Sequence, residues 1–146
     1  MAADAATIHA SAVLVGPKAA LIRGPAGSGK SRLAWDLLQS SLPFVRLVGD
    51  DRVHVETHAG CLLVRPAAQL AGLLEIRGLG IRRLPFESVA AVGLVVDLAA
   101  EDAARHPQEI GKTAICGVLL PRLAVAPGVP ALAMVLAFLK APPAGI

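Results

Sequence analysis

Aromatic residues, cysteines and charged side chains are all scarce in this chain of 146 residues. Tyrosine is absent and aromatic residues make up only 3% of the chain, so the sequence offers no row of stacking rings for single-stranded nucleic acid. The two cysteines, Cys61 and Cys116, form no Cys-x-x-Cys pair and are too few for a disulfide framework, which predicts small buried side chains in a reducing compartment. Hydrophobic residues make up 55% and charged residues 17%, the reverse of a disordered composition. We therefore expect one globular domain over residues 1–146 with a dense aliphatic core.

Long hydrophobic runs are also missing, although the mean hydropathy is +0.63. The longest uncharged stretch, 123–139, is shorter than the roughly 20 apolar residues of a spanning helix, and prolines interrupt it at Pro127 and Pro130. The first ten residues have no basic segment before an apolar run, so no signal peptide is expected. The formal net charge is +3 and the basic residues are scattered. These features predict a cytoplasmic protein that binds neither membranes nor nucleic acids, and they fit an acidic or phosphate-bearing partner.

Hydrophobic patterning predicts an α/β chain, because apolar strands alternate with a helical pattern around a glycine-rich loop. The many short strands favour a mixed sheet over a purely parallel one. A helix is expected over 30–40, a short helix over 67–74, a loop over 75–81 and a frayed tail from about residue 141. The expected strands are 11–15, 19–22, 44–48, a hairpin over 53–64 that turns at Ala59–Gly60, 89–98, 116–120 and 123–125.

The clearest motif is a glycine-rich loop that matches Gly-x-x-x-x-Gly-Lys-Ser in full. Its residues are Gly24, Pro25, Ala26, Gly27, Ser28, Gly29, Lys30 and Ser31. An apolar strand precedes the loop and an amphipathic helix follows it, which is the context that a phosphate-binding P-loop requires. Glycines allow successive N–H groups to line one concavity, and the helix N-terminus adds partial positive charge. In such loops the lysine reaches the β- and γ-phosphates of a nucleotide and the serine hydroxyl is a ligand of Mg²⁺, so the motif predicts ATP and Mg²⁺ as cofactors.

Two carboxylates follow the apolar run 44–48. Asp50 and Asp51 are expected at the carboxyl end of a strand, where α/β sheets bind their ligands. One carboxylate can hold the metal's water shell, and the other can accept a proton from an incoming hydroxyl. The alternative is a solvated turn with an aspartate cap, and the glycine-rich loop favours the functional interpretation.

Other polar or aromatic residues have structural interpretations that we favour. His54 and His58 have the four-residue spacing of helical metal ligands, but their segment is expected to be a strand and no third ligand is near. His106 is expected in a solvated loop, and Trp35 is expected to pack rather than to contact substrate. His9, taken alone, is a lone histidine near the start of a strand, and such residues are more often structural than catalytic.

Four elements of the sequence agree in order and spacing with one protein family. They are Ile8–His9–Ala10, the glycine-rich loop, Asp50-Asp51-Arg52-Val53, and LLEIRGLGI at Leu73–Ile81. In this combination the chain resembles the C-terminal catalytic domain of the HPr kinase/phosphorylase family over about residues 8–130. The resemblance implies a P-loop fold with a mixed sheet and flanking helices, related to phosphoenolpyruvate carboxykinases. It also implies ATP-dependent phosphorylation of a serine on HPr, the small carrier of the phosphotransferase system, and the reverse dephosphorylation by inorganic phosphate.

The resemblance assigns roles by motif position. Lys30 corresponds to the phosphate-loop lysine, while Ser31 and Glu75 correspond to magnesium ligands. Asp51 resembles the residue that accepts the proton in phosphorylation and returns it in the reverse reaction, with Asp50 beside it. The other family matches are His9 as the active-site histidine, Arg77 in the signature loop 75–81, and Arg105 as a late catalytic arginine.

The sequence departs from the family in several places, among them a shortened segment after the signature loop and an abbreviated C-terminal extension. His9 lies close to the beginning of the sequence, where a typical member carries an additional N-terminal domain, so we expect a short form. Segment 125–130 lacks the two arginines of the corresponding family segment, which is associated with the phosphorylase direction. Family members are hexameric, and self-association of this chain remains an open alternative.

Two alternatives of other classes also remain open. A non-catalytic regulatory module would bind ATP through the same loop and act by contacting other proteins. A small-molecule kinase of the ordinary P-loop type would need a lid rich in arginine, and no such segment follows the core.

Overall fold

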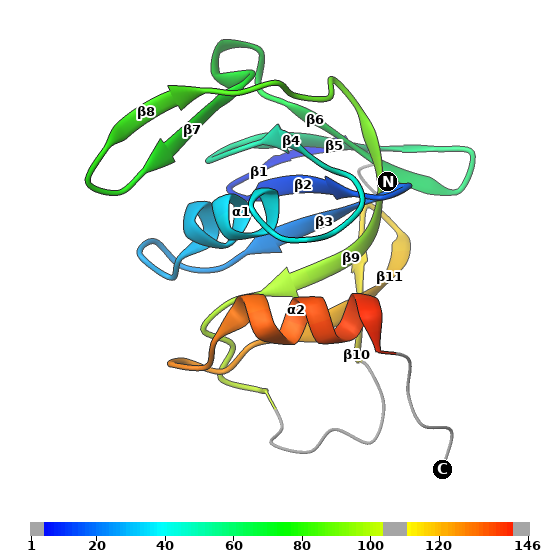
Figure 1. The fold of residues 1–146 in the computed structure, drawn as a ribbon. Coiled ribbons are helices and arrows are strands. Elements are labelled where there is room, and N and C mark those ends of the chain that lie inside the picture. Colours follow the sequence, from blue (N-terminus) through cyan, green and yellow to red (C-terminus); the bar gives the residue numbers. More distant parts are fainter. Residues whose placement is uncertain (1–4, 104–110, 142–146) are drawn as a thin grey trace.

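The computed structural model describes residues 5–103 and 111–141, which form a large mixed sheet with two helices (Figure 1). The helices are α1 (Lys30–Leu38) and α2 (Ala131–Lys140), and a single 3-10 turn spans Ala68–Leu70. The strands are β1 (Ala5–Ile8), β2 (Ser11–Val15), β3 (Lys18–Arg23), β4 (Val45–Gly49), β5 (Val53–His58), β6 (Cys61–Pro66), β7 (Leu73–Ile76), β8 (Gly80–Arg83), β9 (Ala90–Asp97), β10 (Gly111–Ile115) and β11 (Val118–Ala124). Neither described helix has the length and apolar character needed to cross a membrane.

The main sheet has the strand order β1-β5-β6-β9-β3-β2-β4, and β11 joins it beside β9. Strand β9 pairs in parallel with both β3 and β11, while the other pairings are antiparallel. The prediction of a mixed sheet is therefore confirmed. Since β2 is antiparallel to both β3 and β4, strands β3, β4, β9 and β11 all point the same way. Their carboxyl ends meet at one edge of the sheet, which is the edge where α/β folds bind ligands.

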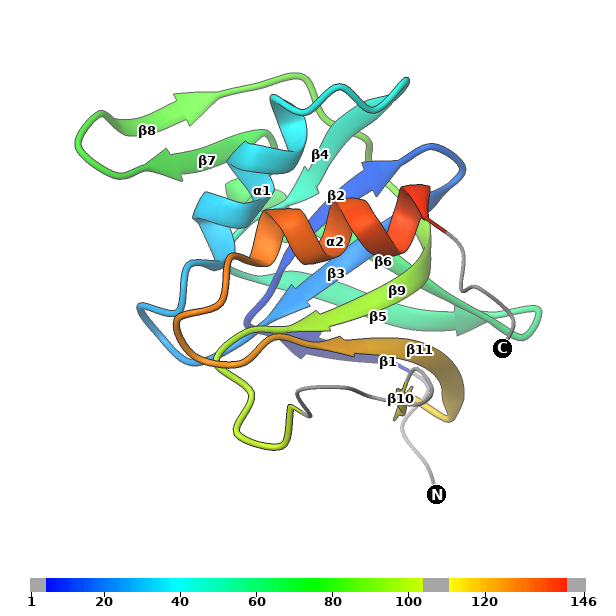
Figure 2. The same ribbon diagram turned by 60° about the horizontal axis from the view of Figure 1, so that its bottom comes forward.

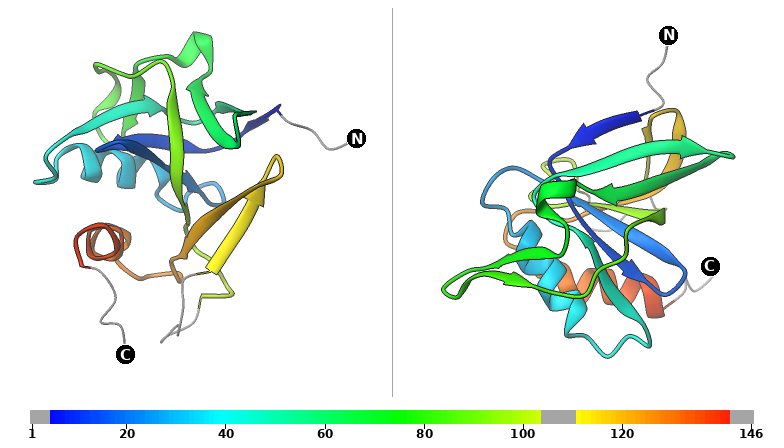
Figure 3. Two further views of the ribbon diagram at one scale, coloured as in Figure 1. Left: turned by 90° about the vertical axis from the view of Figure 1, so that its right-hand side faces the viewer. Right: turned by 90° about the horizontal axis from the view of Figure 1, so that it is seen from above.

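Apolar clusters cover both faces of the central strands. One cluster joins β2, β3 and β9 to the β5–β6 hairpin, with Leu21, Val55 and Leu62 fully buried. The other lies under the two helices, which cover the opposite face together (Figures 2 and 3). Adjacent residues of β3 show this division, because Leu21 belongs to the first cluster and Ile22 to the second. Burial on both faces explains why these strands are almost continuously hydrophobic.

Several local predictions are confirmed. The strands expected over 11–15, 19–22, 44–48 and 89–98 correspond to β2, β3, β4 and β9, and the hairpin over 53–64 turns at Ala59–Gly60 as expected. Trp35 packs against the cluster under the helices, as predicted.

Other predictions were wrong. The helix expected over 67–74 is only one 3-10 turn, after which β7 begins at Leu73. The loop expected over 75–81 is the end of the β7–β8 hairpin, which projects from the body of the molecule (Figure 1). The two strands expected between 116 and 125 are one strand, β11, and Cys116 lies in the turn before it. Cys61, predicted to be buried, is exposed at the start of β6.

Strands β1 and β10 and helix α2 were not predicted. Of the expected tail, residues from 142 on lie outside the described part of the chain, and so does His106.

Candidate functional site

The glycine-rich loop connects β3 to α1, as the sequence predicted. Gly27 and Gly29 adopt φ angles of 80° and 99°, left-handed values that glycine reaches without steric cost. Gly24 is required for a different reason, because a Cβ atom there would lie 2.5 Å from Ser28 Oγ and 3.2 Å from the carbonyl oxygen of Leu98. Helix α1 begins after Gly29 without a side-chain cap. Its first N–H groups are therefore free of a competing side chain at the point where anions bind helices.

The Lys30 side chain folds back over this loop. Its Nζ atom donates hydrogen bonds to the carbonyl oxygens of Gly24 at 2.9 Å and Pro25 at 3.3 Å. The hydroxyl of Ser28 is buried and has no hydrogen-bond partner within the described residues, which is a rare state for a polar atom in a protein. The loop thus combines a cationic amine, an uncapped helix end and an unsatisfied hydroxyl, a set of donors that fits phosphate oxygens.

Asp50 lies just beyond the end of β4 and is only 5% exposed. Ser11 Oγ donates to its Oδ1 atom at 2.5 Å, and Ser31 Oγ lies 2.8 Å from Oδ1 and 2.9 Å from Oδ2. A buried carboxylate needs such donors because it has lost its water. The structure thus brings Ser31, at the start of α1, next to Asp50 at the end of β4. A hydroxyl held beside a carboxylate is oxygen-ligand chemistry of the kind that suits Mg²⁺.

Asp51 follows in the chain but occupies a different environment. It is exposed and has a φ angle of 69°, a left-handed conformation that is uncommon for residues other than glycine and that occurs often at functional sites. The backbone N–H of Arg52 donates to the carbonyl oxygen of Asp50 at 2.8 Å, which closes the turn. The turn separates one buried carboxylate from one that faces solvent.

His9 is linked to the same turn. The Arg52 guanidinium donates from Nη2 to His9 Nε2 at 2.7 Å, so the ring accepts at Nε2. His9 itself is exposed. The sequence elements of Ile8–Ala10 and of Asp50–Val53, which lie apart in the chain, are therefore in contact in the fold.

Glu75 and Arg77 belong to the β7–β8 hairpin, which packs beside α1 through the fully buried Leu74. Because strand residues alternate between faces, Glu75 lies on the opposite, exposed face of β7. Within the part of the chain that the structure describes, the side chains of Glu75 and Arg77 form no hydrogen bond or ion pair, and no group of three or more acidic, histidine or cysteine side chains forms a metal site. His54 and His58 lie on strand β5, as expected. Arg105 lies outside the described residues.

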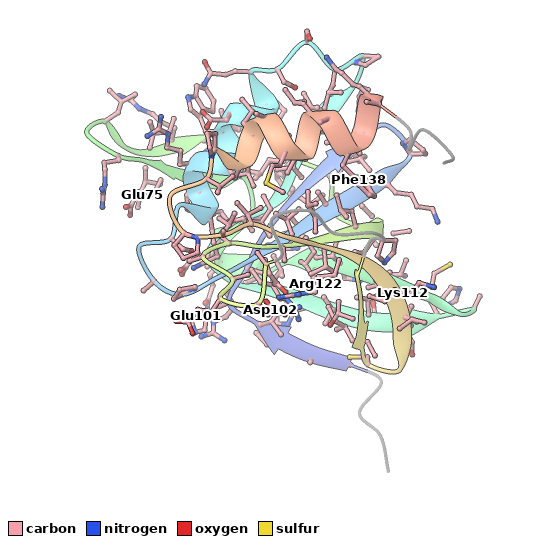
Figure 4. All side chains as sticks on the ribbon, turned by 90° about the horizontal axis from the view of Figure 1, so that it is seen from below. Glu75, Glu101, Asp102, Lys112, Arg122 and Phe138 are labelled. Carbon is pink, nitrogen blue, oxygen red and sulfur yellow. The ribbon has the colours of Figure 1, made fainter. Side chains whose placement is uncertain are left out.

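A network of four charged side chains at the same edge of the sheet was not predicted. Asp97, at the end of β9, accepts hydrogen bonds from Arg23 Nε at 2.7 Å, from Arg23 Nη2 at 2.8 Å and from Arg122 Nε at 2.5 Å. Arg122 also forms a bidentate pair with Asp102, at 2.9 and 3.0 Å, and the two labelled side chains lie close together in Figure 4. The sequence held one signal of this network, an aspartate at the end of an otherwise apolar strand.

The charges of this network shift the pKa values of Asp97, Asp102 and Arg122. Partial burial alone would raise the pKa of Asp97, but the hydrogen bonds and charges of Arg23 and Arg122 outweigh it and hold this pKa below its usual value. Hydrogen bonds from Arg122 lower the pKa of Asp102 in the same way. The two carboxylates in turn raise the pKa of Arg122. Asp97, Asp102 and Arg122 are therefore charged near neutral pH.

Residues 1–125 match the family model of the HPr serine kinase C-terminal domain, so the chain belongs to this family, as the sequence motifs predicted. The HPr kinase/phosphorylase of Streptococcus thermophilus is 41% identical over 80 residues, which are 54% of this chain and 25% of that protein. The HPr kinase/phosphorylase of Mycoplasma mycoides is 36% identical over 73 residues, or 50% of this chain and 22% of the relative.

These matched segments span about a quarter of the length of the curated relatives. Among solved structures, the HPr(Ser) kinase/phosphatase from Coxiella burnetii has a TM-score of 0.77 with this chain at 20% sequence identity. The likeness covers 92% of this chain and 88% of that structure. It shows that the fold is shared.

Proposed function

We propose that this chain is an ATP- and Mg²⁺-dependent kinase that phosphorylates a serine of HPr in the cytoplasm. The observation that carries the proposal is the Ser31–Asp50 pair at the first turn of the helix that follows the glycine-rich loop. Together with Lys30, it supplies a cation, a hydroxyl and a carboxylate at one edge of the sheet. Membership of the HPr serine kinase family supports the same substrate.

In this proposal the loop residues 24–31 act as a P-loop. Backbone N–H groups of the loop and of the first turn of α1 bind the phosphates, and Lys30 exchanges its carbonyl partners for phosphate oxygens. Ser31 and Asp50 hold Mg²⁺, directly or through its water, and Glu75 is a further ligand. Bound there, the metal would neutralise negative charge that develops on the transferred phosphoryl group.

Asp51 is the proposed general base. It is exposed and next to the buried Asp50, so it can meet a hydroxyl that arrives from solvent. A serine hydroxyl is a weak nucleophile at neutral pH and needs such a base. As the serine oxygen bonds to the γ-phosphorus, the bond from that phosphorus to the β–γ bridging oxygen breaks. The proton passes to Asp51, and ADP leaves with the electron pair.

His9, Arg77 and Arg105 complete the proposed machinery by their match to the family's functional positions. The contact of His9 with Arg52 supports a place for the histidine beside the base. Inorganic phosphate attacking the phosphoserine would run the reaction backwards and give pyrophosphate, with Asp51 returning the proton. The names of the relatives, HPr kinase/phosphorylase, support this second direction. Segment 125–130 lacks the two arginines that the family associates with the phosphorylase direction. Of the two activities, we therefore expect dephosphorylation to be the weaker one.

The test is transfer of label from γ-labelled ATP to purified HPr, followed by identification of phosphoserine. We expect transfer by the unaltered chain, a loss of at least about 100-fold in Lys30→Ala, and normal transfer in Lys112→Ala, a matched exposed lysine on β10. ATP binding without transfer, with affinity indifferent to Asp51→Asn, would instead identify the regulatory module.

A further inference from the structure

The Asp97 carboxylate, at the end of β9, links strands β3 and β11 by accepting hydrogen bonds from one arginine on each. Arg23 ends β3 and grips Asp97 with two nitrogen atoms, while Arg122 on β11 reaches Asp97 with its Nε atom. The side chains of Asp97, Arg122 and Arg23 are 15%, 21% and 30% exposed. Charges held at this depth are less screened by solvent than surface charges, and a two-pronged arginine grip fixes geometry as well as energy.

The backbone ties the same three strands together at the same level. Leu98 N–H donates to the carbonyl oxygen of Arg23 at 2.8 Å, and Val125 N–H donates to that of Asp97 at 2.9 Å. In the sheet register, Asp97 lies opposite Arg23 on one side and opposite Ala124 on the other. The side chain of Asp97 thus fixes β3 at its last residue, immediately before the glycine-rich loop starts.

The beginning of that loop has little freedom of its own. Gly24 lies so close to Leu98 that an added Cβ would be 3.1 Å from the Leu98 Cβ atom. The carbonyl oxygen of Gly24 also receives the hydrogen bond from Lys30 Nζ at 2.9 Å. A displacement at Arg23 is therefore passed to Gly24, and from there to the lysine and the first turn of α1.

From these contacts we propose that Asp97 is a positioning residue, which sets the shape of the nucleotide-binding loop by holding Arg23 between β9 and β11. This proposal rests on the proposed function, because it assumes that the loop binds ATP. Asp97 acts through Arg23 and touches neither substrate nor metal. Asp102 belongs to the same network but is 68% exposed, and among the described residues its side chain pairs only with Arg122, so it should have little influence on the loop.

The experiment compares Asp97→Asn with Asp102→Asn, which makes the same chemical change at the exposed end of the network. For each variant we would measure the dissociation constant for ADP with Mg²⁺ by calorimetry, and the KM for ATP and kcat with HPr as acceptor. A small displacement far from the chemistry can cost ~100-fold in rate. If Asp97→Asn relaxes the loop only in part, we expect the dissociation constant for ADP and the KM for ATP each to rise by about tenfold. The change in kcat should be smaller. In Asp102→Asn none of these three quantities should change.

A rise in KM with little change in kcat distinguishes a positioning role of Asp97 from a mere loss of stability. A variant that is merely less stable would have fewer active molecules, which lowers kcat and leaves KM unchanged. If Asp97→Asn does not fold, Arg23→Lys keeps the positive charge but loses the two-pronged grip, and a rise in KM for ATP is expected there too. Asp97→Glu should recover part of the lost affinity.

Three outcomes would overturn the proposal. Normal ADP affinity in both Asp97→Asn and Arg23→Lys would remove the link from Asp97 to the loop, while leaving the kinase function intact. An equal effect of Asp102→Asn would show that the charge of the whole network matters rather than the grip on Arg23. Failure of the unaltered chain to bind ADP or ATP would overturn the kinase function and this inference together.

Discussion

The hydroxyl of Ser31 lies within 2.9 Å of both carboxylate oxygens of Asp50, although the two residues belong to a helix and to the end of a strand. The contact joins the glycine-rich loop to the turn that carries both aspartates. It also means that the buried charge of Asp50 depends on two serine hydroxyls, those of Ser31 and Ser11. The Asp50 side chain therefore contributes both to the stability of the fold and to the proposed binding of Mg²⁺.

Replacing Asp50 should destabilise the fold. In Asp50→Asn one carboxylate oxygen becomes an NH₂ group, which cannot accept a hydrogen bond, so the hydroxyls of Ser11 and Ser31 are left with one neutral acceptor oxygen in place of a charged carboxylate. We expect the free energy of unfolding in urea to fall by about 1–3 kcal/mol. Asp36→Asn is the matched control, since within the described residues the Asp36 side chain on α1 forms only a 3.8 Å ion pair with the exposed Arg32, and a change below about 0.5 kcal/mol is expected. Equal effects of the two substitutions would contradict this account.

Asp51 should show a conflict between stability and activity. Its φ of 69° favours glycine, and relief of the left-handed conformation offsets the extra chain entropy of unfolded glycine. Asp51→Gly should therefore leave stability unchanged or raise it by up to about 1 kcal/mol, while phosphoryl transfer to HPr is lost. Ala59→Gly is the control, because Ala59 has a φ of 51° in the exposed β5–β6 turn. It should gain stability and keep full transfer, whereas retained transfer in Asp51→Gly would exclude the base role.

Gly24 should not tolerate alanine. The added Cβ would lie 2.5 Å from Ser28 Oγ and close to Leu98, so the loop must shift. We expect Gly24→Ala to lose about 1–3 kcal/mol in thermal or urea unfolding and to bind ADP more weakly. Adding Ser28→Ala removes the closest atom and should restore part of the stability. Gly111→Ala, with only ordinary contact at 3.8 Å, should be nearly neutral, and a double variant no better than Gly24→Ala would show that Leu98 causes the strain.

The Asp97 network should make the free energy of unfolding depend on pH in the acid range. The pKa of Asp97 is lower in the folded chain than its ordinary value of 3.8, so the unfolded chain binds the proton more tightly. The stabilisation is present above that ordinary value and is lost as the pH falls through the folded pKa. Urea unfolding at several pH values should therefore show a gap between the unaltered chain and Asp97→Asn that is constant near neutral pH and closes below about pH 4.

Asp102→Asn is the control for this pH dependence. The pKa of Asp102 is lowered as well, but solvent screens the interaction at this exposed position. The difference in unfolding free energy between the unaltered chain and Asp102→Asn should therefore be much smaller. A gap for Asp97→Asn that widened in acid would contradict the sign of the argument.

Glu75 provides a test of the proposed metal ligands. If it completes the Mg²⁺ site, Glu75→Gln should raise the Mg²⁺ concentration needed for half-maximal transfer by about tenfold, which is the scale of losing a supporting metal contact. Glu56→Gln removes a comparable exposed carboxylate that is paired with Arg65 on the neighbouring strand and should leave the Mg²⁺ requirement unchanged. An unaltered requirement in Glu75→Gln would remove Glu75 from the site.

The sequence predicted the parts of the site that depend on neighbouring residues. Glycines at fixed spacing, an apolar strand before them and a helical repeat after them located the loop at 24–31. The end of an apolar run located Asp50. These signals lie within a few residues of the groups that they position, so no knowledge of the sheet was needed.

The Arg23–Asp97–Arg122 network could not be predicted in the same way. Arg23 and Asp97 are 74 residues apart, and their contact requires the parallel pairing of β3 with β9 in one particular register. Only the order of strands in the folded sheet decides that register. The β7–β8 hairpin was mistaken for a loop because Gly78 and Gly80 suggested irregular structure, whereas they shape the end of a paired hairpin. Strand β10 was missed because exposed Lys112 and half-buried Thr113 break an apolar pattern.

The parallel pairing of β3 with β9 also bears on how the chain folds. Helix α1 and the loop before it can form from local contacts, but the grip on Arg23 requires closure of a loop of more than seventy residues, which is entropically costly and slow. An early intermediate would hold a flexible glycine-rich loop with little affinity for nucleotide. Nucleotide present during refolding should therefore bind only after β9 has docked, so it should slow unfolding without speeding the folding step that precedes docking.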